Sequence, residues 1–305
     1  MSERIKMNTA GEPETDPVSE SADTGEDMQT EKNMAGPYEI IVLDLDGTLT
    51  NRDKVITPRT KAALMKAQER GKKVVLASGR PTQGVMPLAK ELRLEEYSGY
   101  ILSFNGGRII NAQTGEVIYQ KTLPADMPAL LYDMSREYKT NIMTYLEETV
   151  ITPKKDDQYV ELESRINKME VREVEDFKSF VNFPVTKCLM VEDGEYLAVV
   201  EKKVKARLGD MLSVLRSEPF FLEIMPKNID KAYSLGKLLE HLGMEREQMI
   251  ACGDGFNDRS MIEFAGLGVA MANAQEPVKA AADHVTVSND EDGVAVVVEQ
   301  FILGE

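Results

Sequence analysis

The stretch YEIIVLDLDGT, residues 38–48, decides the fold class of this chain. A continuous β-branched and aliphatic run that ends in a glycine-containing turn is typical of a strand buried on both faces of a parallel sheet. The next segment predicts a helix, with Thr57 as N-cap, Pro58 at the first helical position and Gly71 as the stop. A second apolar strand, KKVVLASGR, follows at residues 72–80. Strand, helix and strand in this order predict a right-handed parallel unit.

The same alternation returns near the C-terminus. Helical patterns at residues 230–243 and 257–266 alternate with apolar strands at 248–255 and 267–272, and a last helix is expected at 293–303. This rhythm predicts an α/β fold, a doubly wound Rossmann-like core with a parallel sheet. Ligands of such sheets bind at the carboxyl ends of the strands.

The middle of the chain departs from this rhythm and predicts an inserted α+β domain. Short strand-like stretches, among them GYILSFNG, RIINA and EVIYQK, are interrupted by only a few helical segments. We therefore expect a core built from residues 37–82 and 227–305 and an inserted cap domain at 83–226. Residues 1–36 are rich in acidic and small polar residues, which predicts a disordered acidic tail.

Composition limits the partners and the compartment. The chain has 305 residues and a net charge of −16, which argues against nucleic acid because binding a phosphate backbone requires Lys and Arg. No stretch approaches the roughly 18 apolar residues of a membrane span, and no signal peptide is recognisable. Two separated cysteines, Cys188 and Cys252, favour a reducing cytoplasm over a disulfide framework. The sequence is silent on oligomeric state.

Three polar clusters each follow a predicted core strand, and strand ends meet at one edge of a parallel sheet. They are residues 44–48 (DLDGT), 78–80 (SGR) and 253–258 (GDGFND). Taken alone, DLDGT is equally compatible with an acidic turn. Together, the clusters crowd the carboxylates of Asp44, Asp46, Asp254 and Asp258, which is costly unless a cation compensates them. Oxygen ligands of this kind suit Mg²⁺.

These residues resemble the haloacid dehalogenase-like superfamily, specifically its Cof-type phosphatases, from about residue 38 to the C-terminus. DLDGTLT, ASGR, the lysine of KNIDKA and GDGFNDRSMI resemble the four family motifs, in the family's order. The run at residues 268–295 resembles the family's C-terminal segment. Departures are mild: Ser78 stands where many relatives carry Thr, and the residues before Lys231 lack the usual glycine.

The resemblance implies a magnesium-dependent phosphatase that acts on a small phosphorylated metabolite, with sugar phosphates foremost. Asp44 would attack phosphorus to form an aspartyl-phosphate, and Asp46 would serve as general acid and base. The phosphoryl oxygens would be held by Ser78, by Lys231 and by the backbone amides of Leu45 and Gly79. Asn257 would add a phosphate or substrate contact. The Mg²⁺ ligands would be Asp44, the carbonyl of Asp46, Asp254 and, directly or through water, Asp258.

Several alternatives stay open at the level of sequence. Lys231 taken by itself is better explained as a surface lysine that opens a helix, and only its position between the insertion and the fourth motif favours a role in the site. Asn105 and Gly106 of SFNGG could contact substrate or only form a turn between strands. The chain could be a phosphosugar mutase, which passes phosphate between hydroxyls, or a catalytically silent sensor of a phosphorylated metabolite. The cap is expected to close over the site and to select the substrate.

Overall fold

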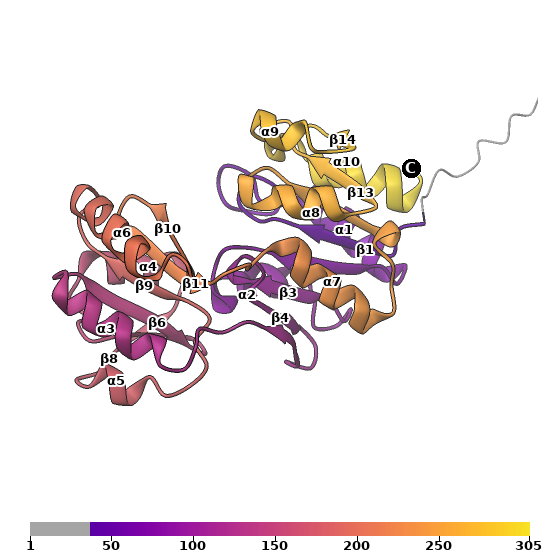
Figure 1. The fold of residues 1–305 in the computed structure, drawn as a ribbon. Helices are drawn as coiled ribbons and strands as arrows, with labels where there is room; N and C mark the ends of the chain where they lie inside the picture. Colours follow the sequence, from indigo (N-terminus) through magenta and orange to yellow (C-terminus); the bar gives the residue numbers. More distant parts are fainter. Residues whose placement is uncertain (1–36) are drawn as a thin grey trace, which may run out of the picture. The chain divides into compact units, whose positions relative to one another are not determined.

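The computed structural model describes residues 37–305, which form two sheets flanked by helices (Figure 1). The predicted acidic tail, residues 1–36, lies outside the described residues. The first sheet is the core sheet, with strand order β14-β13-β12-β1-β2-β3-β4-β5. Its strands are β1 (Ile40–Leu43), β2 (Lys73–Ala77), β3 (Tyr100–Ser103), β4 (Arg108–Asn111), β5 (Val117–Gln120), β12 (Met249–Gly253), β13 (Leu267–Ala270) and β14 (His284–Val285).

Strand β1 lies at the centre of the core sheet and pairs in parallel with both β2 and β12. Parallel pairing continues from β14 to β3, and β4 and β5 complete the edge in antiparallel register. The strand order changes direction between β1 and β12, which is the switch point where such folds bind ligands. The predicted α/β class with a Rossmann-like core is confirmed.

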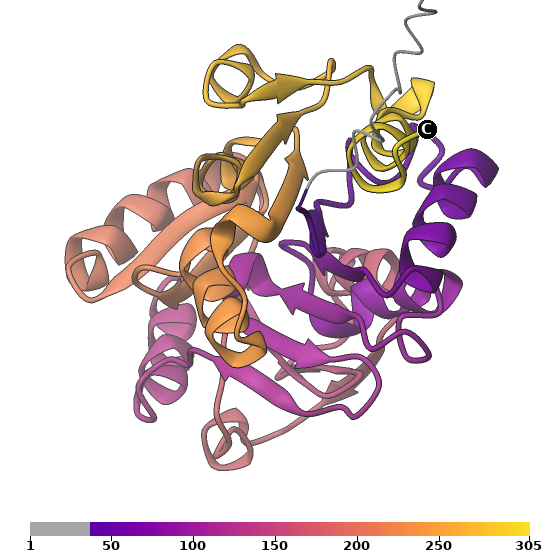
Figure 2. The same ribbon diagram turned by 90° about the vertical axis from the view of Figure 1, so that its right-hand side faces the viewer.

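Alternate residues of β1 enter two different cores, because successive side chains of a strand point to opposite faces. Ile41 and Leu43 pack with α1 (Pro58–Glu69), α2 (Thr82–Glu91) and α10 (Gly293–Val298). Ile40 and Val42 pack with α7 (Lys231–Leu242) and α8 (Arg259–Phe264). Figure 2 shows these helices on the two faces of the sheet. Burial on both faces explains the uninterrupted apolar run at residues 40–43.

Helix α1 begins and ends where the sequence predicts. The Thr57 side chain accepts a hydrogen bond from the amide of Thr60, and Pro58 is the first helical residue. The helix ends at Glu69, and Gly71 has a φ of +83°. A cap of this kind stabilises a helix by about 1 kcal/mol.

The predicted boundary of the insertion is wrong. Strands β3, β4 and β5, which the prediction assigned to the cap, extend the core sheet from β2 through the parallel β2–β3 pair. The helix α2 before them also packs on the core. Local sequence predicts a strand but not the sheet that it joins, since sheet membership depends on long-range pairing. The segment that leaves the core sheet is residues 121–226, called the cap region below.

The cap region forms the second sheet, with strand order β10-β11-β9-β6-β7-β8. Its strands are β6 (Asn141–Leu146), β7 (Thr149–Thr152), β8 (Glu170–Glu173), β9 (Cys188–Val191), β10 (Leu212–Glu218) and β11 (Phe221–Pro226). Its helices are α3 (Met127–Glu137), α4 (Gln158–Asn167), α5 (Phe177–Phe180) and α6 (Gly194–Leu208). The chain leaves and rejoins the core at adjacent points, because Lys121 Nζ lies 3.3 Å from the carbonyl oxygen of Asn228.

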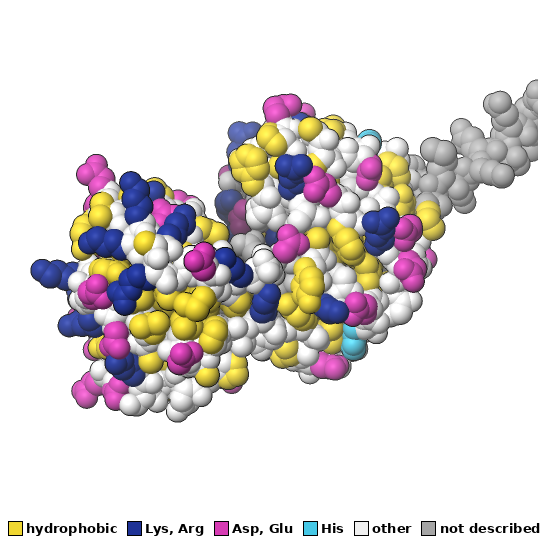
Figure 3. All heavy atoms as spheres, in the orientation of Figure 1, with side chains coloured by type: hydrophobic (Ala, Val, Ile, Leu, Met, Phe, Trp, Pro, Cys, Tyr) yellow, Lys and Arg dark blue, Asp and Glu magenta, His cyan; other side chains and the backbone are white. Residues whose placement is uncertain are grey.

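Short helical elements complete the chain. They are α9 (Glu276–Lys279), the 3₁₀ turns η1 (Phe104–Gly106), η2 (Arg246–Gln248), η3 (Phe256–Asp258) and η4 (Asn289–Glu291), and the π-helical η5 (Glu299–Leu303). Within residues 37–305, no helix combines the length and apolarity needed to cross a membrane. On the face seen in Figure 3, basic and acidic side chains are interspersed.

Candidate active site

Asp44 follows β1 directly and marks the switch point of the core sheet. Its amide donates to the carbonyl oxygen of Cys252 in β12 (3.0 Å), and its carbonyl accepts from the amide of Leu49 (3.1 Å). The residue is only 7% exposed. These contacts fix the backbone on both sides of Asp44, and its carboxylate lines a cavity of about 830 Å³. Asp44 therefore follows a core strand, as the sequence predicts, and borders this cavity.

Lys231 forms hydrogen bonds at the ends of β1 and β2 and with Asp258 of the fourth motif. Its Nζ lies 2.7 Å from Asp44 Oδ1, 2.6 Å from Asp258 Oδ1 and 2.9 Å from the carbonyl oxygen of Ala77. Lys231 is the first residue of α7, whose N-cap Asp230 accepts from the amide of Tyr233, and it is 1% exposed. The alternative of a surface lysine is therefore excluded.

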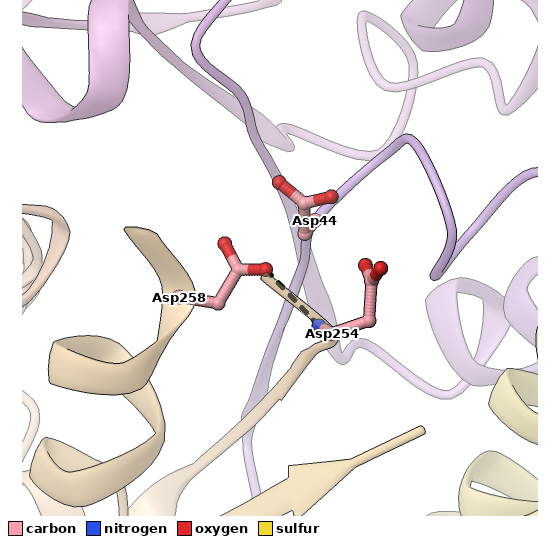
Figure 4. A group of neighbouring side chains, drawn as sticks. All are labelled: Asp44, Asp254 and Asp258. Carbon is pink, nitrogen blue, oxygen red and sulfur yellow. Dashed lines mark hydrogen bonds between the residues drawn. The ribbon is translucent and has the colours of Figure 1, made fainter. Parts of the chain in front are cut away.

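Three carboxylates meet at this point. One oxygen each from Asp44, Asp254 and Asp258 lies within 4.8 Å of the others, and Figure 4 shows them converging from the ends of β1 and β12 and from η3. Asp258 Oδ2 accepts from the amides of Asp254 (3.0 Å) and Gly255 (2.8 Å). Asp254 Oδ1 accepts from Thr48 Oγ1 at 2.9 Å. Hard oxygen donors at this spacing fit a divalent cation such as Mg²⁺.

Gly47 is required by space and by backbone conformation. Its φ is +94°, which L-residues with a Cβ seldom adopt. A Cβ built at this position would lie 2.3 Å from Asp254 Oδ2. The glycine of DLDGT therefore lets the Asp254 carboxylate approach the turn that follows β1.

Burial and the crowding of negative charge raise the pKa values of Asp44 and Asp254. Burial, followed by the charge of Asp258, raises the pKa of Asp44 well above its usual value. Burial likewise raises the pKa of Asp254 to about 6. Burial opposes the charge of Lys231, but Asp44 and Asp258 outweigh it and raise the lysine pKa. One ammonium thus faces three carboxylates, and a cation would allow all three to ionise.

Asp46 turns toward two basic side chains. Arg80 binds it in a two-pronged contact, with Nε 3.0 Å from Oδ2 and Nη2 2.6 Å from Oδ1. Lys54 Nζ lies 2.8 Å from Oδ1. Burial opposes ionisation of Asp46, but hydrogen bonds and charge from Lys54 and Arg80 outweigh it and lower the pKa. Asp46 is therefore an ionised carboxylate in this arrangement.

Sequence reasoning missed both basic partners of Asp46. Arg80 belongs to the SGR cluster, but the sequence assigns it no role of its own, and nothing in the sequence points to Lys54. The available signal was Arg80 itself, because the planar fork of a guanidinium matches the two oxygens of a carboxylate. Lys54 gave no such signal, since it lies in a turn and has a φ of +60°.

The other predicted phosphate contacts gather around the same cavity. Ser78 and Gly79 follow β2 and line it, as does Asn257. Ser78 Oγ accepts from the amide of Arg80 (3.2 Å), and Asn257 Nδ2 donates to Asn105 Oδ1 (3.2 Å). Leu45, the remaining predicted contact, is fully buried and is not among the residues that line this cavity.

Asn105 lies at this edge of the core sheet rather than in a remote turn. Its amide donates to the carbonyl oxygen of Ser78 (2.9 Å), its φ is +56° and its side chain lines the large cavity. The sequence left open whether SFNGG contacts substrate or only forms a turn. The segment does form the turn between β3 and β4, and its Asn105 also belongs to the cavity wall.

The cap region supplies the opposite wall of the large cavity. Lys187 Nζ pairs with Glu223 Oε1 at 3.0 Å, and both residues are under 10% exposed. Glu163 accepts from Tyr145 Oη at 2.7 Å. Lys187, Glu223 and Glu163 line the same cavity as Asp44 and Asp46. The cavity therefore lies between a charge-rich strand edge and a cap wall that contains an ion pair and a carboxylate bonded to a tyrosine hydroxyl.

This arrangement has the parts that phosphoryl transfer requires. A buried carboxylate is held by an ammonium at the switch point, a second carboxylate lies two residues away, and an acidic cluster fits a divalent cation. Positioning and neutralisation of charge are the main catalytic contributions in such reactions.

Comparison with known proteins agrees with the site. The family model for haloacid dehalogenase-like hydrolases matches residues 41–298. The chain is 34% identical over 271 residues to YxeH of Bacillus subtilis, named as a candidate phosphatase, covering 88% of this chain and 100% of that protein. A crystal structure of a haloacid dehalogenase-like hydrolase from Bacteroides thetaiotaomicron matches with 52% identity and a TM-score of 0.83, covering 86% of this chain and 99% of that one.

A third similar structure is the HAD subclass IIB sugar phosphatase BT4131, with 25% identity and a TM-score of 0.69, covering 86% of this chain and 98% of that one. Hydrolases of this family use a divalent metal, and the acidic cluster offers one a place. The chain therefore belongs to the haloacid dehalogenase-like hydrolase family, in its Cof-type phosphatase branch, and is an enzyme of the phosphatase class.

Proposed function

We propose that the protein is a Mg²⁺-dependent phosphatase that hydrolyses a small phosphorylated metabolite through an aspartyl-phosphate on Asp44. The observation that carries the proposal is the buried Asp44 carboxylate, 2.7 Å from Lys231 Nζ and grouped with Asp254 and Asp258. A silent sensor would need neither a nucleophile nor the neutralisation built around it.

Asp44 is the nucleophile in this proposal. One carboxylate oxygen is engaged by Lys231, so the attacking oxygen is the other, Oδ2. Attack on phosphorus forms the Asp44–phosphate bond and breaks the bond to the leaving alkoxide. Lys231 offsets the charge of both the carboxylate and the incoming phosphoryl group, which reduces the repulsion between two anions.

Asp46 is the general acid and base. It protonates the leaving oxygen and then takes a proton from the water that attacks the aspartyl-phosphate. Because Lys54 and Arg80 keep Asp46 ionised, it must leave these partners to bind a proton. We propose that bound substrate draws the basic side chains toward its phosphate and so frees Asp46 to become protonated.

The phosphoryl oxygens are held by donors at the strand ends. In this proposal they are Ser78 Oγ, the amides of Leu45 and Gly79, Lys231 Nζ and Asn257. The carboxylates of Asp44 and Asp254, the carbonyl of Asp46 and the nearby Asp258 would hold Mg²⁺. When bound there, Mg²⁺ supplies positive charge against the transferring phosphoryl group and orients it.

The substrate class that we favour is a sugar phosphate. The cavity wall formed by the cap region contains Glu163 and Glu223, each of which has carboxylate oxygens able to accept from sugar hydroxyls. A structurally similar protein is a sugar phosphatase. Closure of the cap region would exclude water and bring this wall to the leaving group.

The test is release of inorganic phosphate from a panel of phosphorylated metabolites, by the purified protein with Mg²⁺ and with EDTA. Asp44→Asn is expected to lower kcat by about 10⁴-fold or more, because the amide that replaces the carboxylate cannot form the covalent intermediate. An unchanged melting temperature of the variant would exclude unfolding as the cause. Turnover that survives Asp44→Asn would refute the mechanism, and phosphate retained on an isomerised product would indicate a mutase.

A further inference from the structure

Arg108 is the first residue of β4 and carries a guanidinium that no described residue neutralises. Within residues 37–305, its side chain takes part in no ion pair or hydrogen bond, and its Nε is buried without a partner. Partial burial lowers its pKa, as expected for a charge that is partly removed from water. A buried N–H group without an acceptor lowers the stability of the fold. The unpaired Nε–H of Arg108 therefore points to an acceptor on a bound ligand.

A second cavity of about 230 Å³ surrounds this arginine. Its walls come from both the core and the cap region, and they include Arg108, Gln120, Tyr145, Thr186 and Lys187. Gln120 Nε2 donates to Thr186 Oγ1 at 3.2 Å, which leaves the Thr186 hydroxyl hydrogen available to another acceptor. Arg108 and Thr186 therefore place donors around one small space.

The electrostatics of this cavity favour an anion. Lys187 is already paired with Glu223, so it adds no net charge. One carboxylate, Glu147, also lines the cavity, but it is exposed and forms no ion pair with Arg108. Arg108 is thus the uncompensated charge, and its planar fork matches the two oxygens of a carboxylate or phosphate.

The second cavity adjoins the catalytic one. Pro81 and Lys187 line both, and the larger cavity contains Asp44 and Asp46. Arg108 is three residues from Asn105, which contacts Asn257 at the catalytic edge. Three residues span at most about 11 Å of backbone. A leaving group of several carbons attached to the phosphate at Asp44 can therefore extend toward Arg108.

We propose that Arg108, assisted by Thr186, binds a second acidic group, a terminal carboxylate or phosphate, on the leaving group of the substrate. This inference rests on the proposed phosphatase function and narrows its substrate class. The preferred substrate is then a phosphorylated sugar acid or a sugar bisphosphate rather than a neutral sugar phosphate.

Three esters with six-carbon skeletons test the proposal: glucose 6-phosphate, 6-phosphogluconate and fructose 1,6-bisphosphate. Wild-type kcat/KM is expected to be at least tenfold higher for one acidic ester than for glucose 6-phosphate, and the preferred ester identifies carboxylate or phosphate as the second group. Arg108→Met is expected to lower that value by about 10- to 100-fold, mainly through KM, because a charge-assisted contact is lost. The value for glucose 6-phosphate is expected to change less than about twofold.

Controls separate this subsite from general damage. Arg136→Met removes an exposed arginine of α3 and is expected to change none of the three values. Thr186→Val is expected to weaken the acidic ester alone, by about three- to tenfold, and serves if Arg108→Met does not fold. No preference for an acidic ester in the wild type, or an equal loss on all three esters, would overturn the proposal.

Binding distinguishes failure of the subsite from failure of the proposed function. In an Asp44→Asn background, isothermal titration is expected to show tighter binding of the acidic ester than of glucose 6-phosphate, and Arg108→Met to remove the difference. If no ester is hydrolysed by wild type yet this difference appears, the phosphatase proposal fails and the subsite stands. Equal affinities would overturn the subsite whatever the turnover.

Discussion

Two lysines are buried almost equally, Lys231 at 1% and Lys187 at 3% exposure, but they lie in opposite electrostatic settings. Lys231 contacts Asp44 and Asp258, with Asp254 beside them. Lys187 has one carboxylate partner, Glu223, and lies 5.5–5.7 Å from the rings of Tyr145 and Phe104. The cap pair is balanced, whereas the strand edge has an excess of negative charge. Only the strand edge around Lys231 therefore requires an additional cation.

The strongest way to break this comparison is to remove each lysine in turn. Lys231→Met and Lys187→Met should each destabilise the protein by about 3–5 kcal/mol, because each leaves buried carboxylates unpaired. Urea unfolding with and without Mg²⁺ measures the difference. Mg²⁺ is expected to stabilise Lys231→Met more than it stabilises the wild type, since it supplies charge at Asp44 and Asp254, and to stabilise Lys187→Met only as much as the wild type. An equal response of the two variants to Mg²⁺ would contradict the distinction.

A smaller effect is expected from two glycines that share a positive φ. Gly47 and Gly115 have φ values of +94° and +73°, but only Gly47 has atoms of Asp254 within reach of an added Cβ. Gly115→Ala should cost about 1 kcal/mol for the backbone alone. Gly47→Ala should cost about 1–3 kcal/mol and weaken Mg²⁺ binding, because the new methyl group displaces the Asp254 carboxylate. Calorimetric titration with Mg²⁺ checks this, and unchanged affinity in Gly47→Ala would argue against Asp254 as a ligand.

The smallest expected effect is in the pH dependence of stabilisation by Mg²⁺. Folding raises the pKa of Asp254 from 3.8 to about 6, so the stability from its bound proton is complete below pH 3.8 and is lost as the pH rises through 6. Mg²⁺ competes with that proton and needs the ionised form. The increase in Tm caused by Mg²⁺ should therefore be about 2–4 °C larger at pH 8 than at pH 5.

Scanning fluorimetry in both buffers, with EDTA as the reference, measures this difference. Asp254→Asn has no proton to lose at this position and should show a much smaller dependence on pH. The same Tm increase at both pH values would mean that Mg²⁺ does not compete with a proton on Asp254, and it would contradict the prediction.

The core was predictable because its signals are local and repeated. The apolar run at residues 40–43, the cap at Thr57 and the polar turns after β1, β2 and β12 are each determined by neighbouring residues. Their convergence follows from parallel pairing, which brings the strand ends to one edge. The structure accordingly brings Asp44, Lys231, Asp254 and Asp258 together.

What the sequence did not reveal depends on long-range geometry. Nothing local to residues 100–120 distinguishes a core strand from a cap strand, so the sequence assigns β3, β4 and β5 to the inserted domain although they belong to the core sheet. The pairing of Asp46 with Arg80 and Lys54 needs two loops at a defined distance. The ion pair of Lys187 and Glu223 requires the register of β9 against β11, which no spacing in the sequence encodes.

The adjacent departure and return of the chain, marked by Lys121 and Asn228, has a consequence for how this enzyme could diversify. A segment whose two junctions are neighbours can be lengthened, trimmed or exchanged while the threading of the core strands stays the same. The choice of substrate can therefore change during evolution while the reaction carried out by the core stays the same. New leaving groups become accessible through changes in one contiguous stretch of the gene, and the residues that carry out phosphoryl transfer need not change with them.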